Sequence, residues 1–261
     1  MCGIVGYVGE RQGLSLALEA LRRMEYRGYD SSGIAVNDGR IDVVKKAGKL
    51  ANLEAVLPEM PGTTAIGHTR WATHGRPTDA NAHPHVSFDG HVAIVHNGII
   101  ENFSPLRQEL ADASVTLHSD TDSEVAAHLL ALAYNEGETA GDFRASALAV
   151  LNRLEGAFTL LFTHAEHPDQ IIAARRSTPL IVGVGEGEMF LGSDVAAFIG
   201  YTKNAVELDQ DTVVVITKEG YEVLTFDGSP AQGRPFTIDW DLDAAEKGGY
   251  DSFMIKEIHE Q

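Results

Sequence analysis

The 261-residue sequence contains one cysteine, Cys2, which follows Met1 directly and opens the apolar run CGIVGYVG. A small residue at position 2 favours removal of Met1, and that removal leaves a chain that begins with a thiol beside a free amine. The reference pKa values are about 8.5 for the thiol and about 7.7 to 8.0 for the amine. The amine can therefore take the proton from an attacking thiol. Because cysteine is also a common small core residue, Cys2 is either a nucleophile or a buried residue of an edge strand.

A second segment suited to chemistry is HTRWATHG, residues 68–75, at the start of a long loop that ends near residue 87. Arg70 can hold a carboxylate through two parallel hydrogen bonds, which a lysine cannot do. An arginine more often makes a surface ion pair. The neighbouring Trp71 favours a binding loop, because a tryptophan is unusual in a polar loop unless it packs on something.

Two further segments carry polar groups at the expected ends of elements. In HNGIIEN, residues 96–102, the side-chain amide of Asn97 and the backbone N–H of Gly98 can both point at a developing oxyanion. The same pair is also typical of an ordinary turn. In DTDSE, residues 120–124, Asp122 lies at an expected helix start, where the helix dipole favours a carboxylate. Asp122 is therefore either a helix-start residue or a ligand for the ammonium group of a substrate.

The charge balance argues against several classes of partner. The chain has 20 Lys and Arg against 38 Asp and Glu, which gives a formal net charge of −18. Such a surface repels nucleic acid and anionic membranes. The first apolar stretch is too short for a signal peptide or a membrane span. A single cysteine cannot form an internal disulfide, so a cytoplasmic location is expected.

Histidines are dense between residues 68 and 96, and imidazole is a common zinc ligand. They are His68, His74, His83, His85, His91 and His96. The chain has no HExxH motif, and their spacing fits no fixed ligand pattern. We therefore expect no metal and no cofactor, and a metal-dependent hydrolase is the weaker alternative.

Apolar periodicity predicts the elements that must position these residues. Spacing of i, i+3, i+4 and i+7 predicts a helix over residues 14–24. Strand-like runs follow at 33–36, 41–45 and 64–68, and a strand over 92–95 is expected to end in a turn at Asn97-Gly98.

Further helices are expected near the middle of the chain, and the second half is expected to be mostly strand. Ser104-Pro105 predicts a helix start, and Thr121 with Glu124 has the spacing of a capping box for the next helix. A further helix is expected over 143–154. Strand-like runs between residues 157 and 226 require a large antiparallel sheet content. Either two sheets stack with helices outside, or one sheet packs helices on one face.

Several of these segments occur in the same order in a known family. They are CGIVGYVG at the start, YRGYDSSG at 26–33, HTRWATHG at 68–75, NAHPH at 81–85, HNGIIEN at 96–102 and SDTDSEV at 119–125. Over essentially its whole length the chain resembles the glutaminase domain of the glucosamine-6-phosphate synthase family, the isomerising glutamine:fructose-6-phosphate aminotransferases. The resemblance implies an α+β N-terminal nucleophile hydrolase fold, a four-layer αββα sandwich of two antiparallel sheets between helices. It also implies a glutaminase domain at residues 1–240 and a linker at 241–261 toward a sugar-isomerase half.

The resemblance implies a role for each motif residue. Cys2 matches the nucleophile that forms a γ-glutamyl thioester with its own amine as base, and Asn97 and Gly98 match the oxyanion hole. The positions that match the glutamine pocket are Arg70 for the carboxylate, Asp122 for the α-ammonium group, and Trp71, Thr73 and His74 in the loop. The implied reaction is hydrolysis of L-glutamine to L-glutamate and ammonia.

In the full-length enzymes the ammonia is used by the sugar-isomerase domain to convert fructose-6-phosphate to glucosamine-6-phosphate, and a homodimer is expected. This chain lacks the sugar-binding part, so we expect glutaminase activity alone. One alternative is the glutaminase domain of another amidotransferase, such as amidophosphoribosyltransferase or asparagine synthetase, which differ at residues 71–74. Another is a non-catalytic regulatory domain that binds glutamine.

Overall fold

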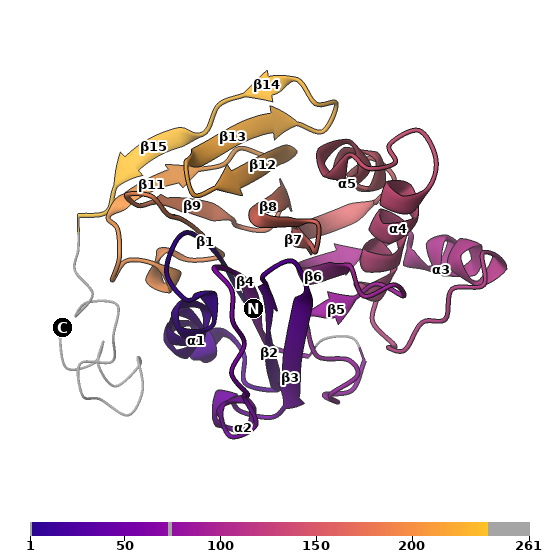
Figure 1. Ribbon diagram of the computed structural model, residues 1–261, viewed down its shortest axis with the longest axis horizontal. Coiled ribbons are helices and arrows are strands. Elements are labelled where there is room, and N and C mark those ends of the chain that lie inside the picture. Colours follow the sequence, from indigo (N-terminus) through magenta and orange to yellow (C-terminus); the bar gives the residue numbers. More distant parts are fainter. Residues whose placement is uncertain (1, 73–74, 240–261) are drawn as a thin grey trace.

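The computed structural model describes residues 2–72 and 75–239, in which two antiparallel sheets lie between two groups of helices (Figure 1). The first sheet contains β1 (Gly3–Val8), β2 (Ser31–Asn37), β3 (Ile41–Ala47), β4 (Thr64–Arg70), β9 (Ile181–Val184), β10 (Met189–Gly192), β11 (Asn204–Glu207) and β15 (Arg234–Thr237). Their order across the sheet is β15-β11-β9-β10-β1-β4-β2-β3. The first strand of the chain is therefore internal, with β10 on one side and β4 on the other.

The second sheet contains β5 (His85–Val86), β6 (Val92–Ile100), β7 (Gly156–His164), β8 (His167–Arg176), β12 (Thr212–Thr217), β13 (Gly220–Thr225) and β14 (Pro230–Ala231). Their order is β14-β13-β12-β8-β7-β6-β5. Sequence neighbours pair as hairpins over most of this sheet, as short connections between antiparallel strands allow.

Helices cover the outer face of each sheet (Figure 1). On the first sheet they are α1 (Gly13–Met24) and α2 (Leu50–Glu54), and on the second they are α3 (Phe103–Asp112), α4 (Glu124–Asn135) and α5 (Phe143–Leu151). Two 3₁₀ turns are η1 (Glu25–Arg27) and η2 (Val195–Ala197). Within residues 2–72 and 75–239, no helix has the length and apolar composition that a bilayer crossing needs.

Side chains of the buried strands alternate between the core that lies between the sheets and the core that lies under the helices. In β1, Ile4 and Val8 point into the core between the sheets, whereas Val5 and Tyr7 point into the core under α1. This follows from the two-residue period of a strand. A strand that is apolar on both faces needs cover on both, and the four-layer arrangement supplies it. The prediction of two stacked sheets with helices outside is confirmed.

Two predicted boundaries are wrong. The expected turn at Asn97-Gly98 is part of β6, which continues to Ile100 because its ladder with β7 runs unbroken to the pair Ile100 and Gly156. Tertiary pairing here overrides the local turn preference. Helix α3 begins at Phe103, with Asn102 and not Ser104 at the N-cap. The expected linker at 241–261 lies outside the described residues.

Candidate active site

A pocket of about 500 Å³ lies where the ends of β1 and β4 in the first sheet face β6 in the second. The register pairs Gly3 with Thr69, so the start of β1 lies beside the end of β4. Strand β6 of the other sheet supplies a further wall. The volume falls within the range of about 300–1,000 Å³ that is usual for small-molecule sites. The pocket is therefore built by both sheets, and its size suits a ligand such as an amino acid.

The sequence-predicted residues meet in this pocket. Its walls include Cys2, Arg70, Trp71, Asn97, Gly98 and Asp122. Thr73 and His74 lie outside the described residues. Residues that are far apart in the sequence are thus brought to one place by strand pairing and by the loop before α4.

The thiol of Cys2 lies partly buried at the pocket wall, directly before β1. The backbone N–H of Trp71 donates a hydrogen bond to Cys2 Sγ over 3.2 Å. Burial raises the pKa of the Cys2 thiol, while the Trp71 N–H and the charge of Arg70 act in the opposite direction. Since the thiolate and not the thiol is the nucleophile, this site needs a base close to the sulfur.

The segment at residues 28–30 supports the end of β4. A Cβ at Gly28 would lie 2.5 Å from the carbonyl carbon of Arg70, so only glycine allows this close approach. Asp30 N–H donates to Arg70 O over 3.0 Å, and Ala72 N–H donates to Asp30 Oδ2 over 2.8 Å. Sequence reasoning missed the role of Asp30, although it lies in the YRGYDSSG motif.

Asn97 and Gly98 occupy the β6 side of the pocket. Asn97 Nδ2 donates to Cys2 O over 3.0 Å, which ties the second sheet to the residue that carries the thiol. Gly98 has a φ of +126°, and a Cβ there would lie 2.0 Å from Ala157 O. Any side chain at position 98 therefore clashes with the neighbouring strand.

Arg70 and Asp122 provide opposite charges in the same pocket. Arg70 is 5% exposed, and its burial lowers the pKa of the guanidinium, opposed by the charges of Cys2, Asp122 and Asp30. Asp122 Oδ2 accepts a hydrogen bond from Ile100 N–H over 2.7 Å. A cation and an anion at fixed positions can bind the α-carboxylate and the α-ammonium group of an amino acid.

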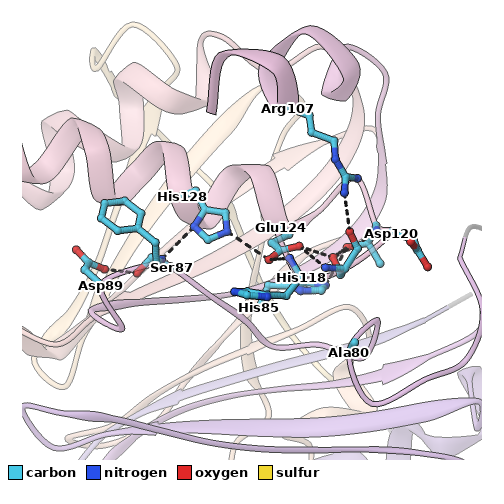
Figure 2. A network of polar contacts seen from close by, with 12 residues as sticks. Ala80, His85, Ser87, Asp89, Arg107, His118, Asp120, Glu124 and His128 are labelled. Carbon is cyan, nitrogen blue, oxygen red and sulfur yellow. Dashed lines mark hydrogen bonds and ion pairs between the residues drawn. The ribbon is translucent and has the colours of Figure 1, made fainter. Parts of the chain in front are cut away.

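The loop that carries Asp122 is held by the buried carboxylate of Glu124 (Figure 2). Glu124 accepts hydrogen bonds from His118 N–H over 2.8 Å and from Ser119 N–H and Oγ–H, both over 2.7 Å. Burial alone raises the pKa of Glu124, but the hydrogen bonds from His128, His118 and Ser119 lower it to about 2. The carboxylate is therefore ionised whenever the protein is folded at neutral pH.

His128 extends this network to the loop before β6. Its Nε2 lies 3.3 Å from Glu124 Oε1, and its Nδ1 accepts a hydrogen bond from Phe88 N–H over 3.0 Å. Figure 2 shows His128 between the segment at residues 87–89 and Glu124. The predicted capping box of Thr121 and Glu124 is wrong, because Ser123 occupies the N-cap and Glu124 bonds to the loop instead. Sequence reasoning missed this function of Glu124.

Four of the clustered histidines, His68, His83, His85 and His96, are buried, and all of them except His85 line the pocket. The rings of His68 and His83 are 4.3 Å apart between centroids, and those of His83 and His85 are 4.6 Å apart. Burial lowers the pKa of His68 to about 3 and that of His83 well below its usual value. Among the residues that the structure describes, no group of His, Cys, Asp or Glu has the arrangement of a metal site.

Comparison with known proteins identifies the class to which this fold and pocket belong. The family model of the glutamine amidotransferase domain matches residues 59–226, and the chain belongs to that family. Among curated proteins it is 62% identical over 272 residues to glutamine–fructose-6-phosphate aminotransferase (isomerizing) of Mycobacterium tuberculosis, and 58% identical over 265 residues to the enzyme of that name from Streptomyces coelicolor. The alignments cover 100% of this chain but 44% and 43% of those proteins, so the chain spans less than half of their length.

A solved structure extends the comparison to the fold. The glutamine phosphoribosylpyrophosphate amidotransferase of B. subtilis superposes with a TM-score of 0.74 at 25% identity, over 86% of this chain and 49% of that one. The predicted N-terminal nucleophile hydrolase fold is confirmed. The amidophosphoribosyltransferase alternative is a structural relative only, since the aminotransferases are far more similar in sequence.

Proposed function

We propose that this domain hydrolyses L-glutamine to L-glutamate and ammonia through a thioester on Cys2. The observation that carries the proposal is the convergence of a thiol, an amide donor and two opposite charges on one pocket. Arg70 binds the α-carboxylate and Asp122 the α-ammonium group, which leaves the side-chain amide of glutamine near Cys2. Trp71 lines the pocket and is 44% exposed, and we propose that Thr73 and His74, which follow it in the sequence, also contribute to glutamine binding.

The first half of the reaction forms the thioester. After removal of Met1 the free amine of Cys2 takes the thiol proton, and Sγ attacks the amide carbon. Asn97 Nδ2 and Gly98 N–H stabilise the negative charge that develops on the amide oxygen. The proton passes from the amine to the leaving nitrogen, the C–N bond breaks, and ammonia departs. One donor of this kind is worth about 2.7–4 kcal/mol of the barrier.

The second half returns the enzyme to its starting state. The amine of Cys2 takes a proton from water, and the resulting hydroxide attacks the thioester carbon. The same donors hold the second oxyanion. The C–S bond breaks, the thiolate recovers its proton, and glutamate leaves. No metal or cofactor takes part in this scheme.

The likeness to the longer aminotransferases supports a second step in the proposal. Residues 1–240 form the glutaminase domain, and residues 241–261 lead toward a sugar-isomerase domain of a homodimeric full-length enzyme. That domain uses the ammonia to convert fructose-6-phosphate to glucosamine-6-phosphate. The 261-residue chain by itself is expected to release ammonia without making an amino sugar.

The amine base gives the sharpest test. We expect the chain to release ammonia from glutamine only when Met1 is removed, because retained Met1 converts the base into a peptide nitrogen. Intact-protein mass spectrometry identifies the N-terminus, and a coupled assay measures ammonia. A chain that keeps Met1 should fold with an unchanged circular dichroism spectrum and lose activity by at least about 100-fold, as expected for loss of a general base.

Three outcomes would contradict the proposal. Full turnover with Met1 in place would exclude the amine as the base. Glutamine binding without ammonia release in a correctly processed chain would support a regulatory binding domain instead. Loss of activity on chelation, with Cys2→Ala still active, would favour a metal-dependent hydrolase.

A further inference from the structure

We propose that His68 is a positioning residue that orients the side-chain amide of Asn97, so that its nitrogen and not its oxygen faces the reacting amide. The inference rests on the proposed glutaminase function and assigns no direct contact with substrate to His68. It starts from the hydrogen bonds at the end of β4, where His68 faces β6 of the other sheet.

The ring nitrogen Nε2 of His68 lies between two acceptors. It is 3.0 Å from the backbone oxygen of His96 and 2.9 Å from Asn97 Oδ1. A backbone carbonyl can only accept, so Nε2 must carry a hydrogen that both oxygens share. The neutral tautomer with the proton on Nδ1 would place a lone pair against two oxygens.

The other end of the same amide gives an independent constraint. Asn97 Nδ2 lies 3.0 Å from Cys2 O, which is also a carbonyl and can only accept. A flipped amide would turn its oxygen toward Cys2 O and its N–H₂ toward the N–H of His68, which is unfavourable at both ends. Since an amide nitrogen carries two hydrogens, the donation to Cys2 O leaves one for an oxyanion in the pocket.

The surroundings of His68 keep its ring in this state. The side chain is fully buried, and Nδ1 makes no hydrogen bond to any part of the chain that the structure describes. The ring packs against His83, whose two nitrogens also lack partners among the described residues. Burial lowers the pKa of His68, as do the charges of Arg70 and His96, and these effects outweigh the hydrogen bonds to Asn97 and His96 O that favour protonation. The ring is therefore neutral at neutral pH, and the two acceptors that face Nε2 hold its single proton there.

A matched pair of substitutions tests this assignment. The amide nitrogen of a glutamine reaches about as far as Nε2 of histidine, whereas that of an asparagine reaches only to the Nδ1 position. We expect His68→Asn to lower kcat for glutamine hydrolysis by roughly 10- to 100-fold, because a whole oxyanion donor is worth about 10²–10³ in kcat. His68→Gln should stay within about 5-fold of the unaltered chain, since it restores the donor. KM for glutamine should change by less than about 3-fold in both variants, because the lost interaction acts in the transition state.

The double variant with Asn97→Ala shows whether His68 acts through Asn97. In that background His68→Asn should lower kcat by no more than about 2-fold further, because the group that it orients is already absent. A full additional loss would overturn the proposal, as would equal activity of His68→Gln and His68→Asn. A rise in KM without a fall in kcat would overturn it as well.

Nuclear magnetic resonance of the unaltered chain decides the point even if His68→Asn does not fold. Long-range proton–nitrogen correlation of the ¹⁵N-labelled ring should show the neutral Nε2–H form from about pH 5 to 8. A neutral ring with its only proton on Nδ1 would refute the assignment, because Nε2 could then not donate to Asn97 Oδ1. If the unaltered, correctly processed chain releases no ammonia, the proposed function fails, whereas the tautomer result concerns the orientation of Asn97 alone.

Discussion

The pocket joins two regions that are held in place by different forces. One region is made by strands: Arg70 and Asn97 are held by pairing with neighbouring strands, and Cys2 directly precedes β1. The loop at residues 118–123 carries Asp122, has no regular structure, and is held by hydrogen bonds to the buried side chain of Glu124. A change in strand geometry should therefore affect the nucleophile and the oxyanion donors. A change in the loop should affect mainly the binding of the substrate ammonium group.

Gly98→Ala should have the largest effect, because it disrupts the pairing of β6 with β7. The added Cβ would lie 2.0 Å from Ala157 O on a backbone with a φ of +126°. Strand β6 must shift, so we expect the free energy of unfolding to fall by at least about 2–3 kcal/mol. Activity should fall by about 10³-fold through misplaced donors. Urea unfolding and ammonia release measure these two effects.

Gly90→Ala is the matched control for that substitution. Gly90 also has a positive φ, +78°, but a Cβ there meets nothing within 4 Å. It should cost about 1 kcal/mol from backbone strain alone and leave activity unchanged. Equal destabilisation by the two substitutions would show that steric contact with β7 is not the cause.

Arg70→Lys tests the proposed binding of the substrate carboxylate by Arg70. It keeps the positive charge but loses the bidentate grip on a carboxylate. KM for glutamine should rise by roughly 10- to 100-fold with a smaller change in kcat, because the interaction is made equally in the ground and transition states. A fall in kcat with KM unchanged would contradict the assigned role. Steady-state kinetics separate the two outcomes.

Glu124→Gln should have the smallest effect on turnover and thereby sharpen the contrast between the regions. In the glutamine variant an N–H₂ group would face one of the backbone N–H groups that now donate to Glu124, so that N–H group would lose its acceptor. We expect a loss of about 2–3 kcal/mol of stability, the usual cost of an unsatisfied buried group. KM for glutamine should rise by about 3- to 10-fold as Asp122 shifts, with kcat little changed.

The pH dependence of stability adds a second measurement to this variant. The pKa of Glu124 is lowered from 4.5 to about 2 on folding, so its carboxylate stabilises the fold fully above its unfolded pKa. This contribution is lost as the pH falls from about 4.5 toward 2. The difference in unfolding free energy between the unaltered chain and Glu124→Gln should shrink over that range. Glu136→Gln, at the exposed end of α4, is the matched control for removal of a glutamate charge from the same helix.

Much of the fold followed from apolar periodicity, because helices and buried strands carry their pattern in the local sequence. The helix expected over 14–24 is α1, and the strand-like runs after residue 156 are found in the two sheets. What local patterns missed depends on distant partners. Asn97-Gly98 is typical of a turn by itself, yet the ladder with β7 keeps it in a strand.

The candidate site shows the same division. The motifs supplied the residues that line the pocket, since each type suits one part of the proposed chemistry. The supports for these residues were not predictable, because Glu124 bonds backwards to its own loop and His68 bonds across to the second sheet. The partners of His68 are defined only once the sheets are stacked, and those of Glu124 only once its loop folds back on the start of α4. The roles assigned to Thr73 and His74 stay predictions.

The internal position of β1 also has a consequence for how the chain is made. One neighbour, β4, follows within the first 70 residues, but the other, β10, ends only at Gly192. At a synthesis rate of about 5–20 residues per second, one edge of β1 stays without its partner for several seconds or longer on the ribosome. An open, apolar edge of this kind is prone to pair with other chains. Nascent chains of this protein should therefore depend more on early binding of chaperones than nascent chains of a protein whose first strand is an edge strand.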